Sequence, residues 1–441
     1  MSGILDFLKL VVHRRFLSRN NLKAYQLKEL KSLIAFAKEH SPYYKDTLED
    51  ISVDKLIDMQ KLPIINKAIM MEHFDTLNTV GLHKDEVLKE AVDKELNKDY
   101  LGYYKDEFVL GLSSGTSGNK GIYITPKSLT QRLPFVFLAR SGIPLRLLPF
   151  KILFMLRVFS QGFNDINAPF ISLKYLSTMT PIEEVIDRIN TFKINILMAP
   201  PSLCRLLLPH AHLIKTPLKM IVTYAEVLEK EEKERLEEVF KCKVIEIYQA
   251  SEGQFASACS HGKLHINEDL VYVELLDEEY QEVTKPHVVA KHMIATNLVN
   301  HAQPLIRYEM NDLIVLDEPC KCGSSFRTIK NVLGRHDDVL KFIKKDGSIQ
   351  AIFPDLMSRW IITSSENIRE YKVVQEVDHS LLITIDPLEN KDLERLRTSL
   401  IERIIKESEV FSVVPNFEVK FESISLPSDM SKYKRFVVRK D

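Results

Sequence analysis

Between residues 181 and 247, short apolar runs alternate with segments of helical periodicity, and this alternation constrains the fold more than any other feature. Strands and helices at this spacing need crossover connections, which make the strands parallel and place helices on both faces of the sheet. The predicted helices are Pro181–Phe192, Leu203–Leu208 (capped by Ser202) and Glu229–Phe240, and the predicted strands are Ile194–Met198, Met220–Thr223 and Val244–Ile247. We therefore predict a parallel sheet covered by helices.

The pattern changes twice after this region. Strand-like runs at Val271–Leu276, His287–Thr296 and Leu313–Leu316 indicate a more β-rich lobe. After Gly334, strands at Tyr371–Val377, Leu381–Ile385 and Phe417–Phe421 surround an amphipathic helix at Leu393–Glu407. Because 441 residues exceed one ordinary core, we predict an α/β fold with a large domain, residues 1–334, that carries mixed and parallel sheets and the β-rich lobe. A small, mobile α+β domain, residues 335–441, follows it.

Composition and termini limit the function classes. The net charge of −1 argues against a broad nucleic-acid-binding surface, and five sparse cysteines indicate reduced thiols rather than a disulfide framework. Met1–Phe16 is apolar but contains Asp6 and Lys9 and lacks the order of a signal peptide. We expect it to pack on the body of the protein in preference to a membrane surface. Charges within Ile143–Phe163 exclude a transmembrane segment there, so we expect a cytoplasmic protein.

Ser113–Gly121, read Ser-Ser-Gly-Thr-Ser-Gly-Asn-Lys-Gly, forms a tight turn between two apolar, strand-like runs. Glycines allow backbone N–H groups to approach a ligand, and the hydroxyls and Lys120 add donors and charge, which suits phosphate oxygens. The spacing is not that of a Walker loop. A flexible surface loop is the alternative interpretation.

Two further stretches follow predicted strands. Tyr248-Gln249-Ala250-Ser251-Glu252-Gly253 offers an aromatic ring for stacking on a base and a carboxylate for a hard cation, at the strand end where parallel sheets bind ligands. Pro304–Asp312 ends in an aspartate that can accept both hydroxyls of a ribose. An ordinary strand exit and an ordinary turn residue are the alternatives.

The domain boundary and the C-terminal tail carry cations. Arg335 offers a fork of donors for ribose or phosphate, and Ser431–Arg435 brings Lys432, Lys434 and Arg435 together. A solvated linker and a solvated basic tail are the alternatives.

These stretches occur in one order, and together they resemble the adenylate-forming acyl-ligase superfamily, which includes acyl-CoA synthetases, peptide-synthetase adenylation domains and luciferases. Within it, the chain most resembles the phenylacetate–CoA ligase and coenzyme F390 synthetase branch. The branch features are His40–Tyr44, Leu62-Pro63 with Lys67, His265–Asp269 and Cys320-Lys321-Cys322-Gly323.

The resemblance implies roles for individual residues. It makes the phosphate loop from Ser113, Ser114, Gly115, Thr116, Ser117 and Gly118, the adenine-side turn from Tyr224, Ala225 and Glu226, and the adenine-stacking residue Tyr248. It assigns Glu252 to magnesium, Asp312 and Arg335 to ribose, and Asp337 to the hinge. Lys432 is the implied catalytic lysine, although Ser431 stands where the family has glycine. Proline often replaces Lys120, which leaves Lys120 without a role.

The implied function is ATP-dependent activation of a carboxylic acid as an acyl-adenylate, with release of pyrophosphate, followed by transfer to a thiol of coenzyme A or of a carrier protein. The implied cofactors are ATP, AMP and Mg²⁺. Transfer to an amine or alcohol, and a non-catalytic nucleotide-binding scaffold, are the alternatives. Cys259, His265, Cys320 and Cys322 are also candidate ligands of a structural Zn²⁺, with His261 as the alternative histidine and reduced thiols on a turn as the alternative state. A homodimer is left open.

Overall fold

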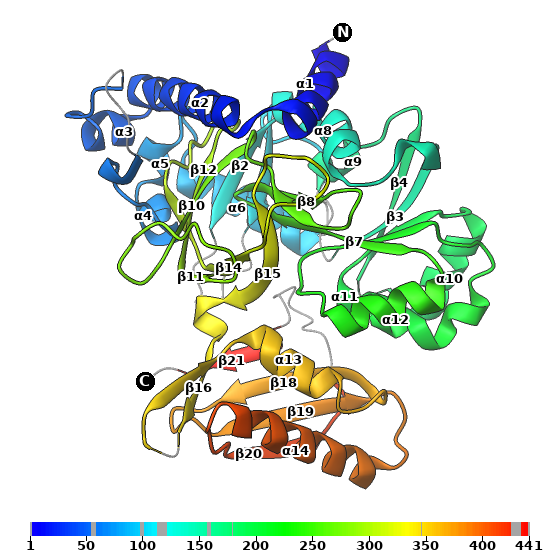
Figure 1. The fold of residues 1–441 in the computed structure, drawn as a ribbon. Coiled ribbons are helices and arrows are strands. Elements are labelled where there is room, and N and C mark those ends of the chain that lie inside the picture. The colour runs from blue at the N-terminus through cyan, green and yellow to red at the C-terminus, as the bar shows by residue number, and fades with distance from the viewer. Residues whose placement is uncertain are drawn as a thin grey trace.

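A computed structural model gives the fold (Figure 1) and describes residues 2–53, 59–97, 101–112, 121–156, 160–178, 180–344, 346–424 and 434–439. Residues Ser113–Lys120 of the candidate phosphate loop, Ser113–Gly121, and the candidate lysine, Lys432, lie outside these ranges.

A ten-stranded sheet forms the centre of the large N-terminal part. Its order is β11-β14-β15-β9-β8-β7-β6-β5-β3-β4. The strands are β3 (Phe150–Leu156), β4 (Ile171–Ser177), β5 (Ile196–Met198), β6 (Met220–Thr223), β7 (Lys243–Ala250), β8 (Gly253–Ala258), β9 (Leu264–Ile266), β11 (Val289–Ala290), β14 (Asp312–Leu316) and β15 (Thr328–Arg335). Strands β4, β3, β5, β6 and β7 run parallel, whereas β7 onward is antiparallel. The predicted parallel sheet is therefore half of a larger mixed sheet.

Both faces of the parallel half are buried, as the apolar runs predicted. Side chains alternate between the faces of a strand, so Leu197 belongs to one apolar cluster and its neighbours Ile196 and Met198 to another. The helices α10 (Ile182–Thr191), α11 (Pro201–Leu207) and α12 (Lys230–Phe240) cover the first face. On the second face, partly buried residues of α8 (Leu133–Arg140) and α9 (Gln161–Asn164) pack against the other cluster.

The β-rich lobe contains smaller sheets. Strands β10 (Val271–Leu276), β12 (His292–Asn297) and β13 (Tyr308–Met310) form a three-stranded sheet, and β1 (Phe108–Leu112) pairs with β2 (Ile122–Pro126). The single strand predicted at His287–Thr296 is wrong. The strand is interrupted at Lys291. Before the interruption, β11 pairs with β14 in the central sheet, and after it, β12 pairs with β10.

The C-terminal segment has its own core. A four-stranded sheet of order β20-β19-β18-β21 packs against α13 (Pro354–Ile362) and α14 (Leu393–Val410), and Trp360, Tyr371 and Leu400 are among its fully buried side chains. Its strands are β18 (Ile368–Gln375), β19 (Leu381–Pro387), β20 (Phe417–Phe421) and β21 (Phe436–Val438), and a hairpin of β16 (Leu340–Ile343) and β17 (Ile349–Ile352) precedes them. In Figure 1 this segment lies below the large sheet.

Helical segments complete the N-terminal part. They are α1 (Ser2–Phe16), α2 (Arg19–His40), α3 (Pro42–Thr47), α4 (Lys67–Glu72), α5 (Phe74–Leu77), α6 (Lys84–Asn97) and α7 (Lys127–Thr130). Helix α1 packs on the body, as expected, because Leu10 joins a small apolar cluster with Val136 of α8 and Leu270. Within the described ranges, no helix is both long and apolar enough to cross a membrane.

Candidate active site

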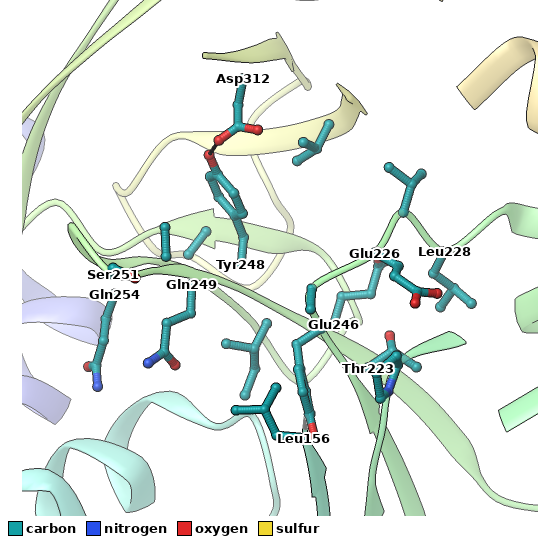
Figure 2. Close-up of a pocket in the computed structure, with 18 of the residues that line it drawn as sticks. Leu156, Thr223, Glu226, Leu228, Glu246, Tyr248, Gln249, Ser251, Gln254 and Asp312 are labelled. Carbon is teal, nitrogen blue, oxygen red and sulfur yellow. Dashed lines mark hydrogen bonds between the residues drawn. The ribbon is translucent and has the colours of Figure 1, made fainter. Parts of the chain in front are cut away.

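A cleft of about 2330 Å³ opens between the central sheet and the C-terminal segment. Its walls include residues of β7 and of the turn after β6, among them Tyr248 and Glu226 (Figure 2). Arg335, Phe353 and Lys434 line it as well. The predicted residues Ala225, Glu226, Tyr248, Glu252, Asp312 and Arg335 all line it. Residues far apart in the sequence therefore converge on one cavity.

Tyr248, Asp312 and Arg335 form one group. Tyr248 lies on β7, and its hydroxyl donates to Asp312 Oδ2 at 2.6 Å (Figure 2). Asp312 begins β14, where its register partner is Arg335 at the end of β15. Burial, followed by the nearby Asp312 carboxylate, raises the pKa of Tyr248 well above its usual range, so its hydroxyl remains a donor at neutral pH. The two candidate ribose contacts thus lie on adjacent strands beside the candidate base-stacking ring.

Glu252 occupies the turn between β7 and β8. Burial raises the pKa of its carboxyl, although the Tyr123 hydroxyl opposes this by donating to Oε1 at 2.6 Å. The Tyr123 and Tyr308 hydroxyls are also 3.1 Å apart. Tyr123 lies on β2, two residues after Gly121, so a side chain from the strand that leaves the candidate phosphate loop holds the candidate magnesium ligand.

The turn after β6 connects the two parts of the protein. Ala225 has a positive φ of 66°. The Tyr224 hydroxyl donates to the Met155 carbonyl at 2.5 Å and lies 3.0 Å from the Met198 carbonyl, which fixes the turn over β3 and β5. Glu226 accepts hydrogen bonds from the backbone N–H and hydroxyl of Ser202 at 3.1 and 2.9 Å. The same carboxylate accepts from Arg435 of the C-terminal segment at 3.2 Å.

The hinge candidate, Asp337, precedes Asp338, which lines the cleft together with Lys434 and Arg435 of the C-terminal tail. Asp337 accepts a hydrogen bond from the Asn311 side chain at 2.6 Å, and Lys434 lies 3.7 Å from Asp338. Arg435 binds both oxygens of Glu370 at 2.7 and 2.9 Å. The tail from Lys434 to Phe436 therefore lines the cleft.

Sequence reasoning missed Tyr123, Tyr308 and Glu246 as residues of the site. Glu246 lines the cleft two residues before Tyr248, and burial raises the pKa of its carboxyl (Figure 2). A charged residue in an otherwise apolar strand was the available signal for Glu246. The two tyrosines carried no comparable signal, because Tyr123 lies in an ordinary apolar strand and Tyr308 in an ordinary alternation of apolar and polar residues.

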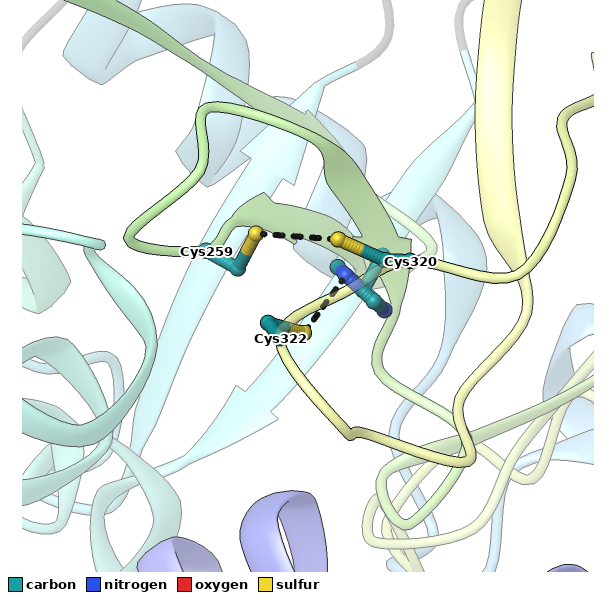
Figure 3. Close-up of side chains that lie close together, drawn as sticks. Cys259, Cys320 and Cys322 are labelled. Carbon is teal, nitrogen blue, oxygen red and sulfur yellow. Dashed lines mark hydrogen bonds between the residues drawn. The ribbon is translucent and has the colours of Figure 1, made fainter.

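A second cluster combines Cys259, His265, Cys320 and Cys322 (Figure 3). One potential ligand atom from each residue lies within 4.8 Å of all the others. Cys259 and Cys320 have sulfurs 3.7 Å apart, and Cys322 Sγ lies 3.4 Å from His265 Nε2. These four are the residues predicted from the sequence, and the cluster contains His265 rather than His261.

The two shortest separations in the cluster fit a tetrahedral ion. With zinc–sulfur distances of about 2.3 Å, a tetrahedron places two sulfurs about 3.8 Å apart, and a sulfur and a nitrogen slightly closer. His265 Nδ1 lies 3.0 Å from the Phe326 carbonyl, which fixes the proton on that nitrogen and leaves Nε2 facing the sulfurs. Burial lowers the pKa of His265 to about 4, so the ring is neutral at physiological pH, as a metal ligand must be.

Comparison with solved structures identifies the fold. The chain superposes on 2-hydroxyisobutyryl-CoA ligase in its postadenylation state, bound to 2-HIB-AMP, with a TM-score of 0.74 at 18% identity, over 98% of this chain and 91% of that one. The same ligase in its thioesterification state, with 2-HIB-AMP and CoA, gives a TM-score of 0.59 over 97% and 91%. The chain therefore has the fold of the adenylate-forming acyl-CoA ligases.

Sequence comparison finds relatives of this chain among the acyl-CoA ligases. The chain is 24% identical to the phenylacetate–coenzyme A ligase of Thermus thermophilus over 345 residues, which cover 74% of this chain and 72% of that protein. It is 25% identical to the Aromatoleum evansii enzyme of the same name over 354 residues, covering 73% and 72%. No family model matches the chain. The chain is thus a homologue of the phenylacetate–CoA ligases, which confirms the resemblance to that branch.

Proposed function

We propose that this protein joins a carboxylic acid to coenzyme A at the cost of ATP. The acid carboxylate attacks the α-phosphorus of ATP, the bond to the β-phosphate oxygen breaks, and pyrophosphate leaves. A thiolate then attacks the acyl carbon and AMP leaves. The observation that carries the proposal is the convergence of Tyr248, Glu252, Asp312 and Arg335 on one cleft.

The nucleotide has a place for each of its parts. The Tyr248 ring offers a stacking face for adenine, and the backbone turn at Ala225 lines the same cleft. Asp312 has one carboxylate oxygen bonded to Tyr248 and a second available for ribose hydroxyls, and Arg335 lies across the strand pair. Ser113–Gly118 would then cradle the phosphates through its backbone N–H groups.

Glu252 is the proposed magnesium ligand. Burial raises the pKa of the Glu252 carboxyl, and a nearby cation would stabilise its charged form. Hard cations such as Mg²⁺ prefer carboxylate oxygens as ligands. When bound, Mg²⁺ would supply charge neutralisation between the two anionic reactants. Tyr123 contributes by orienting the Glu252 carboxylate through its hydroxyl.

The apolar end of the cleft suits an aryl or fatty acid. Phe154 stacks against Tyr224 with ring centres 5.3 Å apart, and Phe163 lies 4.7 Å from Phe154. All three side chains line the cleft. Their flat faces match an aromatic acid, which is also the substrate class in the names of the two sequence relatives.

Two arrangements of the C-terminal segment would serve the two half-reactions. The separate core of that segment supports a boundary at residues 334 and 335, with Asp337 as the hinge. Lys432 would complete the adenylation arrangement, and the contact from Arg435 to Glu226 favours it. Rotation of the segment would then open the acyl-adenylate to a thiol.

The four-residue Cys/His cluster is the proposed structural zinc site. All four ligands come from the protein, which is typical of structural rather than catalytic zinc. Zinc would tie the loop between β14 and β15 to β8 and β9. This role is independent of the reaction.

Product analysis distinguishes the proposed acceptor from its rivals. The protein is incubated with ATP, Mg²⁺ and an aryl acid, and coenzyme A, a pantetheinylated carrier protein or an amine is added in separate reactions. The proposal predicts an acyl-CoA thioester with stoichiometric AMP. If an amide is the sole product, the acceptor is an amine and not coenzyme A. If no acceptor gives a product, the protein is a nucleotide-binding scaffold and not a ligase.

A further inference from the structure

Helix α1 presents an apolar face to solvent. Ile4, Leu5, Leu8, Val12 and Phe16 are exposed by 62%, 64%, 51%, 48% and 75%, respectively. Their spacing places them on one side of the helix, since residues three and four apart are neighbours on a helical surface. A continuous apolar stripe on a terminal helix is unusual for a surface that faces only water.

The opposite face of α1 is firmly attached to the body. Arg14 is buried and donates to the Ser257 hydroxyl at 2.9 Å, Asp6 pairs with Arg132 at 2.8 Å, and the Leu10 carbonyl accepts from Arg140 at 2.9 Å. These contacts determine which side of the helix points outward. The apolar stripe therefore cannot turn inward without breaking three polar contacts, two of which involve buried arginines.

Exposed cations lie on α1 beside the stripe and near the start of α2. Residues 2–23 contain Lys9, Arg14, Arg15, Arg19 and Lys23 but one acid, Asp6, for a net charge of +4 in a chain whose total is −1. Of these cations, Arg14 is buried and Arg19 pairs with the buried Glu268 at 2.6 Å. Lys9, Arg15 and Lys23 are exposed, and Asp6 is neutralised by Arg132. Apolar residues flanked by exposed cations are the pattern of a helix that lies in an anionic lipid interface.

We propose that α1 docks this protein on an anionic lipid surface, with Leu5, Leu8, Val12 and Phe16 inserted at the boundary of headgroups and acyl chains. A second copy of the chain fits the same face less well. The face has seven exposed residues, Ile4, Leu5, Leu8, Lys9, Val12, Arg15 and Phe16, whereas a stable interface takes roughly 20–30 residues a side. Two such faces would also oppose their cations.

The position of α1 gives the docking a consequence. Leu10 packs on Val136 of α8, and Val136 lines the cleft. One helix layer therefore separates the lipid-facing helix from the cavity. If the proposed reaction holds, docking would place the cleft close to apolar carboxylic acids that leave the membrane. The docking itself does not depend on that reaction.

Cosedimentation with vesicles tests the docking. The full chain is mixed with vesicles of phosphatidylcholine alone or with about 30% phosphatidylglycerol. We expect sedimentation with the anionic vesicles, weakened by salt. The double variant Leu5→Glu/Leu8→Glu should lower the partition coefficient at least about tenfold, since it places two charges in the lipid-facing stripe. The control Val410→Glu alters a residue of α14 that is 75% exposed, and should bind as the wild type does.

Three results would overturn the docking. The first is wild-type protein that stays in the supernatant with anionic vesicles, and the second is equal binding by the double variant. The third is a lipid-free dimer that the double variant dissociates, as measured by light scattering, because the stripe would then be an interface between copies. Thermal unfolding of each variant shows that it is folded, and unchanged acyl-CoA formation in detergent-free buffer separates lost docking from lost catalysis.

Discussion

Tyr123→Phe removes one oxygen atom and probes the proposed role of Glu252 directly. The hydroxyl donates to a buried carboxylate at 2.6 Å, and Phe keeps the ring that packs in the core. A hydrogen bond to a charged group contributes about 1.5–3 kcal/mol. Most of that loss should appear in the affinity of Glu252 for its cation, because the hydroxyl orients the carboxylate and favours its ionised form.

The expected effect is large enough to measure. A loss of 1.5–3 kcal/mol corresponds to a roughly 10- to 150-fold higher Mg²⁺ concentration for half-maximal adenylation. Burial already raises the pKa of Glu252, and the lost hydrogen bond raises it further, so the acidic limb of the pH–rate profile should move to higher pH. Both quantities are read from initial rates of adenylation over a Mg²⁺ series at several pH values.

Tyr308→Phe is the matched control. It removes a hydroxyl from the same cluster but leaves the bond from Tyr123 to Glu252 in place. We expect a smaller change in Mg²⁺ dependence for this variant. If Tyr123→Phe shows the wild-type Mg²⁺ dependence and the wild-type acidic limb, Glu252 does not bind the cation in the way proposed.

Three further variants test other parts of the account. Lys432→Ala should lower the adenylation rate by about two to three decades with near-normal ATP binding. The control Lys434→Ala should leave the adenylation rate near that of the wild type. Equal adenylation rates for Lys432→Ala and wild type would remove Lys432 from the mechanism. Cys322→Ser should abolish near-stoichiometric zinc and lower the unfolding temperature, whereas Cys242→Ser should leave the metal content unchanged; a zinc-free wild type would contradict the site. Arg435→Met should destabilise the protein by up to about 3–5 kcal/mol in urea unfolding, since it leaves the largely buried Glu370 with the more distant Arg205, 4.0 Å away, in place of its close partner. Glu226→Gln should destabilise it by about 1 kcal/mol, and equal losses would contradict this order.

The central sheet was predictable because its strands are buried on both faces. Met220–Thr223 is a strand with the predicted bounds, and the helix predicted at Glu229–Phe240 begins one residue later. Apolar runs of strand length between amphipathic helices leave few alternatives to a parallel, doubly covered sheet. Mixed sheets were predicted, but the strand pairing of the antiparallel half was not, since it depends on contacts between distant segments.

Local signals failed where tertiary contacts decide the outcome. No glycine or proline marks the interruption between β11 and β12 at Lys291. The two strands are separate because β11 pairs within the central sheet and β12 pairs within the three-stranded sheet. Ser202 was predicted to cap a helix, but Pro201 begins that helix and Ser202 binds Glu226 instead. A short-range pattern cannot anticipate a partner 24 residues away.

In the candidate site, too, the sequence motifs were predictable, whereas contacts between distant segments were not. Tyr248, Glu252, Asp312 and Arg335 were found through the order of their motifs, and the structure places them in one cleft. The contact of Tyr123 with Glu252 spans 129 positions and was beyond sequence reasoning. Ser113–Gly118 and Lys432 remain predictions, because they lie outside the described residues.

Carboxylate-dependent exchange of labelled pyrophosphate into ATP tests the central claim most directly. It reports the adenylation step alone and needs no knowledge of the thiol acceptor. Across a panel of aryl and fatty acids, the account predicts exchange that requires both Mg²⁺ and an acid from the panel and that falls sharply in Glu252→Gln. ATP binding without exchange for any acid, or exchange that Glu252→Gln leaves unchanged, would contradict it.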